Sequence, residues 1–292
     1  MSTSSGMKTL FKLLLGLLGA ASCLCCCGLG MMSQLAELNV RSPVPGLPVG
    51  EGAGAVELGT VLIPADASPS RAQTYDWKVA TLHPPGNRLT YGLGDTLDAW
   101  LEDQHKAFGR RLRYRSLGGE RFTYQPPRGC SADMRCIYEE LIRSNEGPVK
   151  ALGERFVASV RERKLDSAQA AQLILNFVQR IHYELPTDEP FGIIPPALVP
   201  ARNKGDCDSK AVLAVMLLRQ VGIDAVILYS DPLAHAAVGV GLPGTGTRMR
   251  HGGRTYQYAE VTAEGWPVGM IPPKYDKPRL WRVMALESST SG

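Results

Sequence analysis

The strongest signal in the hydrophobic pattern is an apolar segment that follows residue 206. Residues 211–218 are apolar on nearly every side of a helix, Asp206 is a suitable N-cap, and Gly222 stands where a left-handed C-terminal cap is expected. A helix without a polar face is buried. Cys207 is its first or second residue, where unpaired backbone N–H groups and the helix dipole favour a thiolate over a thiol.

Three segments with the composition of strands follow this helix. They cover residues 224–230, 233–242 and 254–262, which are rich in apolar and β-branched side chains and are joined by short links. Successive strands with short links pair in an antiparallel way. We therefore expect an α+β fold in which the buried helix that carries the cysteine packs on an antiparallel sheet.

The part of the chain before this helix alternates between strand-like and helix-like patterns. Apolar residues recur at three- and four-residue spacing in several stretches, which is typical of helices with one buried face. The predicted elements are strands at 55–63 and 75–82, two helices at 134–144 and 148–163, a helix at 96–113, and a helix that is capped by Asp166 and ends before Pro186.

The N-terminal segment has the pattern of a targeting or anchoring sequence. Lys8 and Lys12 precede residues 13–32, a stretch of twenty residues without a charge. Three interpretations fit: a cleaved signal peptide, an uncleaved membrane anchor, and a bacterial lipoprotein signal in which Cys23 is lipidated. Basic residues on the N-terminal side predict that the rest of the chain lies outside the cytoplasm in all three. We expect a membrane-anchored protein or lipoprotein of a bacterial envelope.

Proline and glycine are dense between this segment and the first predicted strand, which indicates a tether without packed structure. The remaining boundaries follow from the predicted elements. The expected organisation is a signal peptide or anchor at 1–32, a linker at 33–59, a mixed α/β region at 60–165, a core at 166–275 and a C-terminal tail at 276–292.

The composition is that of a globular protein. The chain has 292 residues, of which 44% are apolar and 21% charged, so disorder is not expected. The net charge of +4 is small, and the basic run at 110–115 contains one aromatic residue, so we interpret it as a solvated face and expect no nucleic acid partner. Cys130 and Cys136 either form a small-loop disulfide, if the chain is exported, or are ordinary buried thiols.

A possible catalytic constellation appears in chain order: Cys207 at a helix start, His235 at the head of one strand and Glu260 late in the next. A thiol nucleophile needs a base within hydrogen-bond reach, and the base needs a third group to fix its tautomer. Adjacent antiparallel strands can place His235 and Glu260 side by side. His182, at a helix end upstream, is a further possible base or a surface residue.

Simpler interpretations exist for each of these residues. Cys207 could be a buried thiol, His235 a strand-end histidine and Glu260 a charge on an edge strand. A metal site formed by these three residues with Asp206 and Asp208 lacks paired Cys/His spacing, so we expect no metal and no cofactor. The order of the three residues favours the catalytic interpretation.

Four blocks between residues 173 and 273 resemble the transglutaminase-like cysteine enzymes of the papain-like fold, specifically their bacterial and archaeal branch. The blocks are FVQRIHY at 177–183, GDCDSKA at 205–211, HAAVGV at 235–240, and YAEVT at 258–262 with GWPVG at 265–269. The resemblance implies that Cys207 is the nucleophile, His235 the base and Glu260 the third member of the triad, where many relatives carry aspartate.

The same resemblance places Gln179 near the site, as a second donor to an oxyanion beside the backbone N–H of Cys207, or as a helix-capping residue. Asp206 is interpreted as the helix cap. The expected function is extracytoplasmic acyl transfer on amide bonds through a thioester, as a peptidase, amidase or transamidase acting on a protein or peptide, such as a peptidoglycan peptide. The alternative is a catalytically silent module that binds peptides or envelope components.

Overall fold

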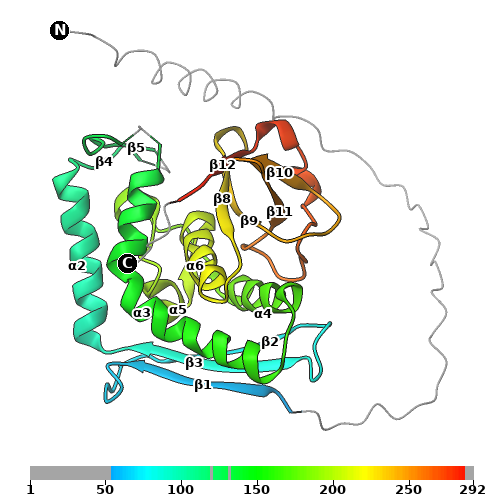
Figure 1. The fold of residues 1–292 in the computed structure, drawn as a ribbon. Coiled ribbons are helices and arrows are strands. Elements are labelled where there is room, and N and C mark those ends of the chain that lie inside the picture. The colour runs from blue at the N-terminus through cyan, green and yellow to red at the C-terminus, as the bar shows by residue number, and fades with distance from the viewer. Residues whose placement is uncertain (1–53, 119–120, 131–132, 287–292) are drawn as a thin grey trace, which may run out of the picture. The chain divides into compact units, whose positions relative to one another are not determined.

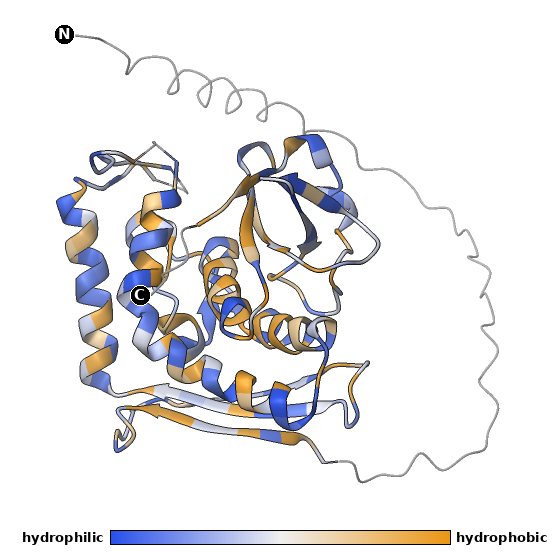
Figure 2. Cartoon of the chain, viewed as in Figure 1, coloured by the Kyte–Doolittle hydropathy of each residue, from blue (hydrophilic) through white to orange (hydrophobic). Residues whose placement is uncertain are grey.

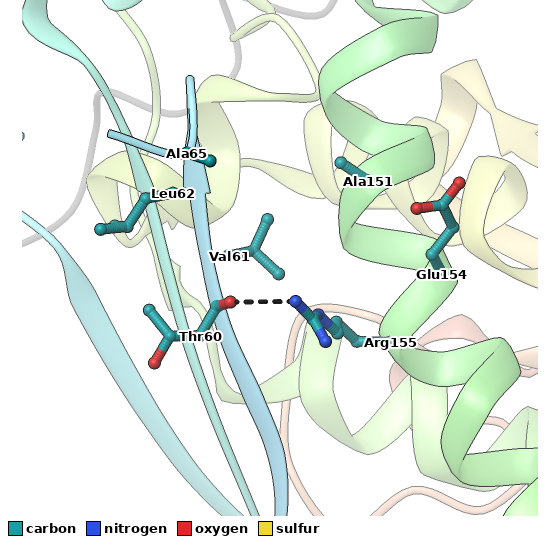
Figure 3. Close-up of a pocket in the computed structure, with 7 residues that line it drawn as sticks. All are labelled: Thr60, Val61, Leu62, Ala65, Ala151, Glu154 and Arg155. Carbon is teal, nitrogen blue, oxygen red and sulfur yellow. Dashed lines mark hydrogen bonds between the residues drawn. The ribbon is translucent and has the colours of Figure 1, made fainter. Parts of the chain in front are cut away.

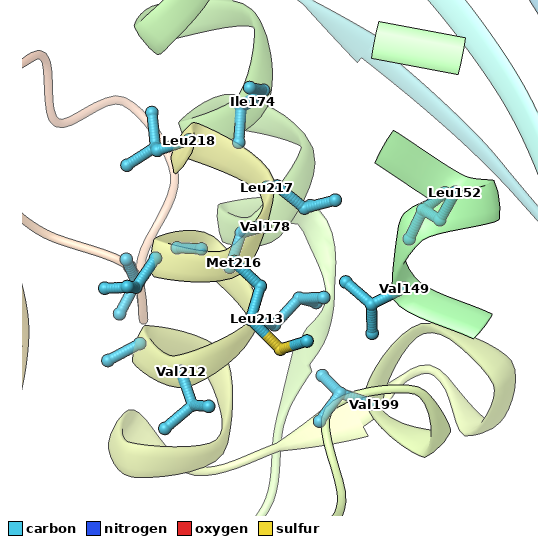
Figure 4. Close-up of a cluster of buried hydrophobic side chains, with 14 of the residues drawn as sticks. Val149, Leu152, Ile174, Val178, Val199, Val212, Leu213, Met216, Leu217 and Leu218 are labelled. Carbon is cyan, nitrogen blue, oxygen red and sulfur yellow. The ribbon is translucent and has the colours of Figure 1, made fainter. Parts of the chain in front are cut away.

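The apolar segment after Asp206 forms helix α6 (Cys207–Gln220), which is buried along most of its length. The structure, a computed structural model, describes residues 54–118, 121–130 and 133–286. Side chains of three other helices surround α6 in one apolar cluster (Figure 4). They are Val149 and Leu152 of α3 (Arg135–Glu162), Ile174 and Val178 of α4 (Ser167–Arg180), and Val199 of α5 (Leu198–Arg202). The all-round apolar pattern is explained by these neighbours, because every face of α6 meets protein.

An antiparallel five-stranded sheet packs against α6, with the strand order β10-β11-β9-β8-β12. This sheet contains the three predicted strands and two more. The short outer strands β10 and β12 were not predicted, because three or four residues carry too little alternation to be recognised. The strands are β8 (Ala225–Ser230), β9 (His235–Val240), β10 (Arg248–His251), β11 (Arg254–Ala259) and β12 (Arg282–Met284).

A second sheet has the order β1-β3-β2 and consists of β1 (Val56–Ile63), β2 (Gln73–Lys78) and β3 (Gly86–Leu93). Strand β3 lies in the middle, parallel to β1 and antiparallel to β2. The sequence did not indicate β3, because a polar residue, Asn87, occupies one of its buried positions. Its side chain is satisfied there by Arg163, which donates to Oδ1, and by the carbonyl of Pro85.

Helices α3, α4, α5 and α6 lie between the two sheets, whereas α2 (Asp95–Arg111) lies at the edge of the molecule (Figure 1). Helices α3, α4 and α5 contact the three-stranded sheet, and α6 contacts α3 and α4 on one side and strands β8 and β9 on the other. Figure 2 shows that α6 and the inward faces of its neighbours are largely apolar, whereas α2 alternates between polar and apolar turns. The remaining strands are two-residue pairs: β4 (Arg115–Ser116) with β5 (Phe122–Thr123), and β6 (His182–Tyr183) with β7 (Lys204–Gly205).

Helix α3 corrects one prediction. Two helices were expected at 134–144 and 148–163, but a single helix runs from Arg135 to Glu162 with Pro148 inside it. A proline removes one intrahelical hydrogen bond and is unfavourable at such a position. Residues from both halves of α3, including Leu141 and Phe156, are buried in the core, so tertiary packing outweighs the local preference.

Both ends of the folded part extend beyond the predicted core and linker boundaries. Strand β1 begins at Val56, inside the predicted linker 33–59, and β12 lies inside the predicted tail 276–292. All described residues belong to one compact unit, Gly50–Gly292. The predicted targeting segment at 1–32 and Cys23 lie outside the described residues. Among the helices that the structure describes, none combines the length and apolarity that crossing a membrane requires.

Replacing Leu217 by alanine should lower the free energy of unfolding by about 2–5 kcal/mol, because it opens a cavity at a fully buried position of α6. Chemical denaturation of the two proteins measures this difference. Leu185→Ala is the matched control, since Leu185 is 44% exposed and its loss should change stability by less than about 0.5 kcal/mol. Equal effects of the two substitutions would contradict the central burial of α6.

Candidate active site

Cys207 is the first residue of α6, and its thiol is the only free one among the described residues. The side chain of Asp206 caps the helix by accepting a hydrogen bond from the backbone N–H of Ser209 at 2.9 Å, as predicted for this residue. The backbone N–H of Ala236 lies within hydrogen-bond reach of the Cys207 sulfur. The N-terminus of α6 therefore faces the start of β9, where Ala236 follows His235.

The side chains of His235 and Glu260 are buried and lie at ion-pair distance, with 3.1 Å between Nε2 of His235 and Oε2 of Glu260. The antiparallel register pairs Ala259 of β11 with Val238 of β9, so that Glu260, just beyond the strand end, reaches the imidazole. Because an ionised carboxylate only accepts, Nε2 carries the proton in this contact and Nδ1 is left as the basic ring nitrogen. The structure thus brings together two of the three residues that were predicted to act as a unit.

Two aromatic rings hold the imidazole of His235. The ring of Tyr275 stacks on it with 3.9 Å between centroids and 12° between planes, and Trp281 meets it edge-on. Both residues precede β12; Tyr275 is the last residue of the predicted core, and Trp281 lies in the predicted tail. Such stacking fixes the plane of the imidazole, which general acid–base chemistry requires.

The carboxylate of Glu260 is held from both sides. Its Oε1 accepts hydrogen bonds from the backbone N–H groups of Val261 and Thr262 and from the Thr262 hydroxyl, and its Oε2 accepts from Tyr258 at 2.8 Å as well as from His235. Burial by itself would raise the pKa of Glu260, but the hydrogen bonds from His235 and Thr262 outweigh burial and lower the pKa to about 2. Glu260 is therefore ionised at neutral pH.

The electrostatics of Cys207 differ from the expectation that a helix N-terminus would stabilise its thiolate. Burial raises the pKa of the Cys207 thiol, and the carboxyl groups of Asp208 and Asp206 raise it further. The hydrogen bond from the Ala236 backbone acts in the opposite direction but is weaker. Burial and the two neighbouring carboxyl groups therefore favour the thiol form of Cys207 over the thiolate.

Gln179 does not have the free amide that the oxyanion prediction requires. Its Nε2 lies 2.9 Å from the carbonyl oxygen of Glu260 and 2.9 Å from that of Trp266, so both amide hydrogens are donated to backbone. In this geometry Gln179 neither presents a donor to substrate nor caps a helix. It fixes the backbone of Glu260 to α4.

Lys210 completes this buried network and was not recognised in the sequence. Its side chain is fully buried, and its ammonium donates to the carbonyl of Ile181 at 2.6 Å, at the C-terminal end of α4. Burial lowers the pKa of Lys210 to about 8, against the attraction of Glu260, Glu264 and Asp206. A lysine within an otherwise apolar helix could have been noticed, since only a specific set of acceptors tolerates it there.

Two cavities lie apart from the Cys207 thiol. One, of about 560 Å³, has a largely polar lining that includes Gln179, His182 and Thr262. His182, which the sequence offered as a possible base, is exposed at this cavity, and Cys207 is not part of its lining. The other, of about 410 Å³, lies between β1 and α3, where Arg155 donates to the carbonyl of Thr60 at 3.3 Å (Figure 3). Neither is lined by Cys207 or His235.

Of the five residues considered as metal ligands, three have ligand atoms that lie within 4.8 Å of one another: Asp206, Cys207 and Asp208. Burial and repulsion by Asp208 raise the pKa of Asp206 to about 7, and the hydrogen bonds from Ser209 act against this shift. The other two residues, His235 and Glu260, are engaged with each other. The structure therefore does not assemble the five-residue site.

Residues 154–262 match the family model described as the transglutaminase-like superfamily. No curated protein sequence matches the chain significantly. Among solved structures, a proposed protease from Parabacteroides distasonis is similar over 51% of this chain, with 12% sequence identity and a TM-score of 0.33. The match spans 35% of that protein, about a third of its length.

The ionised state of Glu260 predicts how stability depends on pH. Its pKa is lower in the folded protein, about 2, than the ordinary value of 4.5, so the folded state binds fewer protons between these values. The stabilisation, on the order of 3 kcal/mol, is complete above pH 4.5 and is lost as the pH falls towards 2. Unfolding free energies of wild type and Glu260→Gln should therefore converge as the pH falls below 4.5. A difference that stays constant down to pH 3 would contradict this environment for Glu260.

Proposed function

Because residues 154–262 form a transglutaminase-like superfamily domain, we propose that this protein is a cysteine-dependent acyl-transfer enzyme that acts on amide bonds. The proposal rests on one observation above all: the buried His235–Glu260 pair lies at the start of the strand whose Ala236 backbone contacts the thiol of Cys207. The superfamily generally contains cysteine enzymes. A nucleophile, a base and a group that orients the base are the three parts that such chemistry needs.

In the proposed mechanism, Nδ1 of His235 accepts the proton of the Cys207 thiol while the sulfur attacks the carbonyl carbon of the substrate. Transfer of this proton during attack is consistent with a thiol whose pKa is raised at rest. The resulting imidazolium is stabilised by the ionised Glu260. The backbone N–H of Cys207, at the open end of α6, is the proposed donor to the oxyanion.

The tetrahedral intermediate collapses when the C–N bond breaks and His235 gives its proton to the leaving amine, which leaves a thioester on Cys207. Water or a second amine then attacks the thioester, His235 accepts the proton of the attacking group, and the Cys207 sulfur leaves. Water gives a hydrolase and an amine gives a transamidase. We propose proteins or peptides as substrates, among them peptidoglycan peptides.

We also propose that the folded part acts outside the cytoplasm, attached to the membrane through its N-terminal segment or through lipid at Cys23. Support comes from the basic residues that precede the uncharged stretch, and from Cys130 and Cys136, which are bonded to each other with 6.1 Å between their Cα atoms. Disulfides persist in oxidising compartments and are rare in the cytosol.

A second candidate function is a catalytically silent module that holds a peptide. The observation in its favour is the state of Cys207, which is 6% exposed and has a raised pKa. Inert structural cysteines share these two properties. The two candidates differ in whether the reactivity of Cys207 depends on His235.

If Cys207 is the nucleophile, its alkylation by iodoacetamide at pH 7 should fall by about a hundredfold in His235→Ala, because the base that accepts its proton is lost. Mass spectrometry of the Cys207 peptide measures the rate separately from the other cysteines. His251→Ala is the control, since His251 is an exposed histidine of β10 and its removal should leave the rate unchanged. A slow rate that is equal in all three proteins would favour the silent module.

Export predicts the oxidation state of the cysteine pair. Protein isolated from its native cells, with free thiols blocked at lysis, should yield a peptide linked through Cys130 and Cys136 in a non-reducing map. The measurement is mass spectrometry of the digest before and after reduction. Recovery of both cysteines in the blocked, reduced form would count against an oxidising compartment.

A further inference from the structure

Asp208 is a carboxyl group at the nucleophile to which the proposed mechanism gives no role. Its Oδ2 lies 3.5 Å from the sulfur of Cys207, and its Oδ1 accepts a hydrogen bond from the hydroxyl of Tyr138. Tyr138 belongs to α3 and is only 2% exposed. A residue of another buried helix thus fixes the orientation of this carboxyl group beside the thiol.

Among the described residues, the hydrogen-bond partners of the Asp208 carboxyl group are the Cys207 thiol and the Tyr138 hydroxyl. None of the ion pairs between described residues includes Asp208. Burial raises its pKa, His235 attracts its negative charge, and Asp231 repels it. Lys210, two residues along the helix, directs its ammonium to the carbonyl of Ile181 at the end of α4.

Two carboxyl groups, those of Asp206 and Asp208, lie beside the Cys207 thiol, although the whole chain has a net charge of +4. A carboxylate beside a thiol opposes formation of the thiolate, which is a disadvantage for a nucleophile. A positive charge on the reactant would remove this disadvantage by compensating the carboxylate when the substrate binds. Asp208 is partly exposed, in contrast to the buried Asp206 and Cys207 on either side of the helix start.

We propose that Asp208 is a specificity-determining residue, which selects reactants that carry a positive charge next to the carbonyl group attacked by Cys207. This inference rests on the proposed function of Cys207 as a nucleophile. The substrate class is an amide with a nearby ammonium or guanidinium group, such as a peptide with a free amino group or a basic side chain at the reacting residue. The buried hydroxyl of Tyr138 positions the carboxylate for this contact.

Charged thiol reagents test the proposal without a known substrate. Methanethiosulfonates transfer an alkylthio group to a cysteine thiolate, forming a disulfide and releasing methanesulfinate. The probes are the cationic 2-aminoethyl, the anionic 2-sulfonatoethyl and the neutral methyl reagents, applied to the full chain at pH 7. Modification of the Cys207 peptide is followed by mass spectrometry. The rate for each reagent is divided by the rate at which the same reagent modifies a small neutral thiol in solution, so that differences in intrinsic reactivity between the reagents cancel.

The normalised rate of the cationic reagent should exceed that of the anionic reagent by tenfold or more at low salt, and the ratio should shrink as ionic strength rises. Asp208→Asn should reduce the ratio to near one. Asp103→Asn, the same substitution at an exposed site on α2, should leave it unchanged. Retention of the wild-type ratio in Asp208→Asn would overturn the assignment to Asp208.

The wild-type protein decides the question even if the Asp208 variant does not fold. Fast modification of Cys207 without a preference for positive charge, or a preference that does not change with salt, would overturn the proposal and leave the nucleophile intact. Slow modification by all three reagents would instead contradict the proposed function of Cys207 and, with it, the inference. A salt-sensitive preference for the cationic reagent supports both.

Discussion

Burial of α6 on every side is the constraint on which the rest of the structure depends. The helix fills the space between α3, α4 and the five-stranded sheet, so its first turn is fixed relative to all of them. Cys207 gains a defined position from this packing, since the backbone at a buried helix start has little freedom. The same burial removes water from the thiol and raises its pKa, which makes the sulfur dependent on its neighbours for activation.

Polar groups that enter this interior are satisfied by one connected network. Lys210 binds the end of α4, Gln179 at that end binds the backbone of Glu260, and the carboxylate of Glu260 binds His235. Each contact is formed by a buried group, so the loss of one partner would leave another unsatisfied. The network connects the helix that begins with Cys207 to His235 and Glu260, the other two members of the proposed triad.

The charges around the thiol are asymmetric. On the side of His235 the imidazole is compensated by the ionised Glu260, whereas Asp208, on the side of α3, has a phenol hydroxyl as its partner instead of a cation. A site of this kind discriminates between reactants by charge as well as by shape. Tyr138 lies 70 positions before Asp208 in the sequence, so no local motif could indicate this contact.

The sequence by itself determined the elements whose signals are local. The apolar stretch after Asp206 indicated a buried helix with its cap and its cysteine, and the strand-like segments that follow it indicated an antiparallel sheet with His235 at the head of a strand. These features depend on side-chain periodicity and capping, which are properties of neighbouring residues. The resemblance of four blocks to transglutaminase-like enzymes agrees with the family match at 154–262.

Only the tertiary structure decided the environment of the site. The continuity of α3 through Pro148, the contact of Trp281 with His235, and the binding of Gln179 to backbone carbonyls all depend on contacts between distant residues. The state of Cys207 is the clearest case. Its place at a helix N-terminus favours a thiolate, but burial and the carboxyl groups of Asp208 and Asp206 raise the pKa, because desolvation and charge at short range exceed the effect of the dipole.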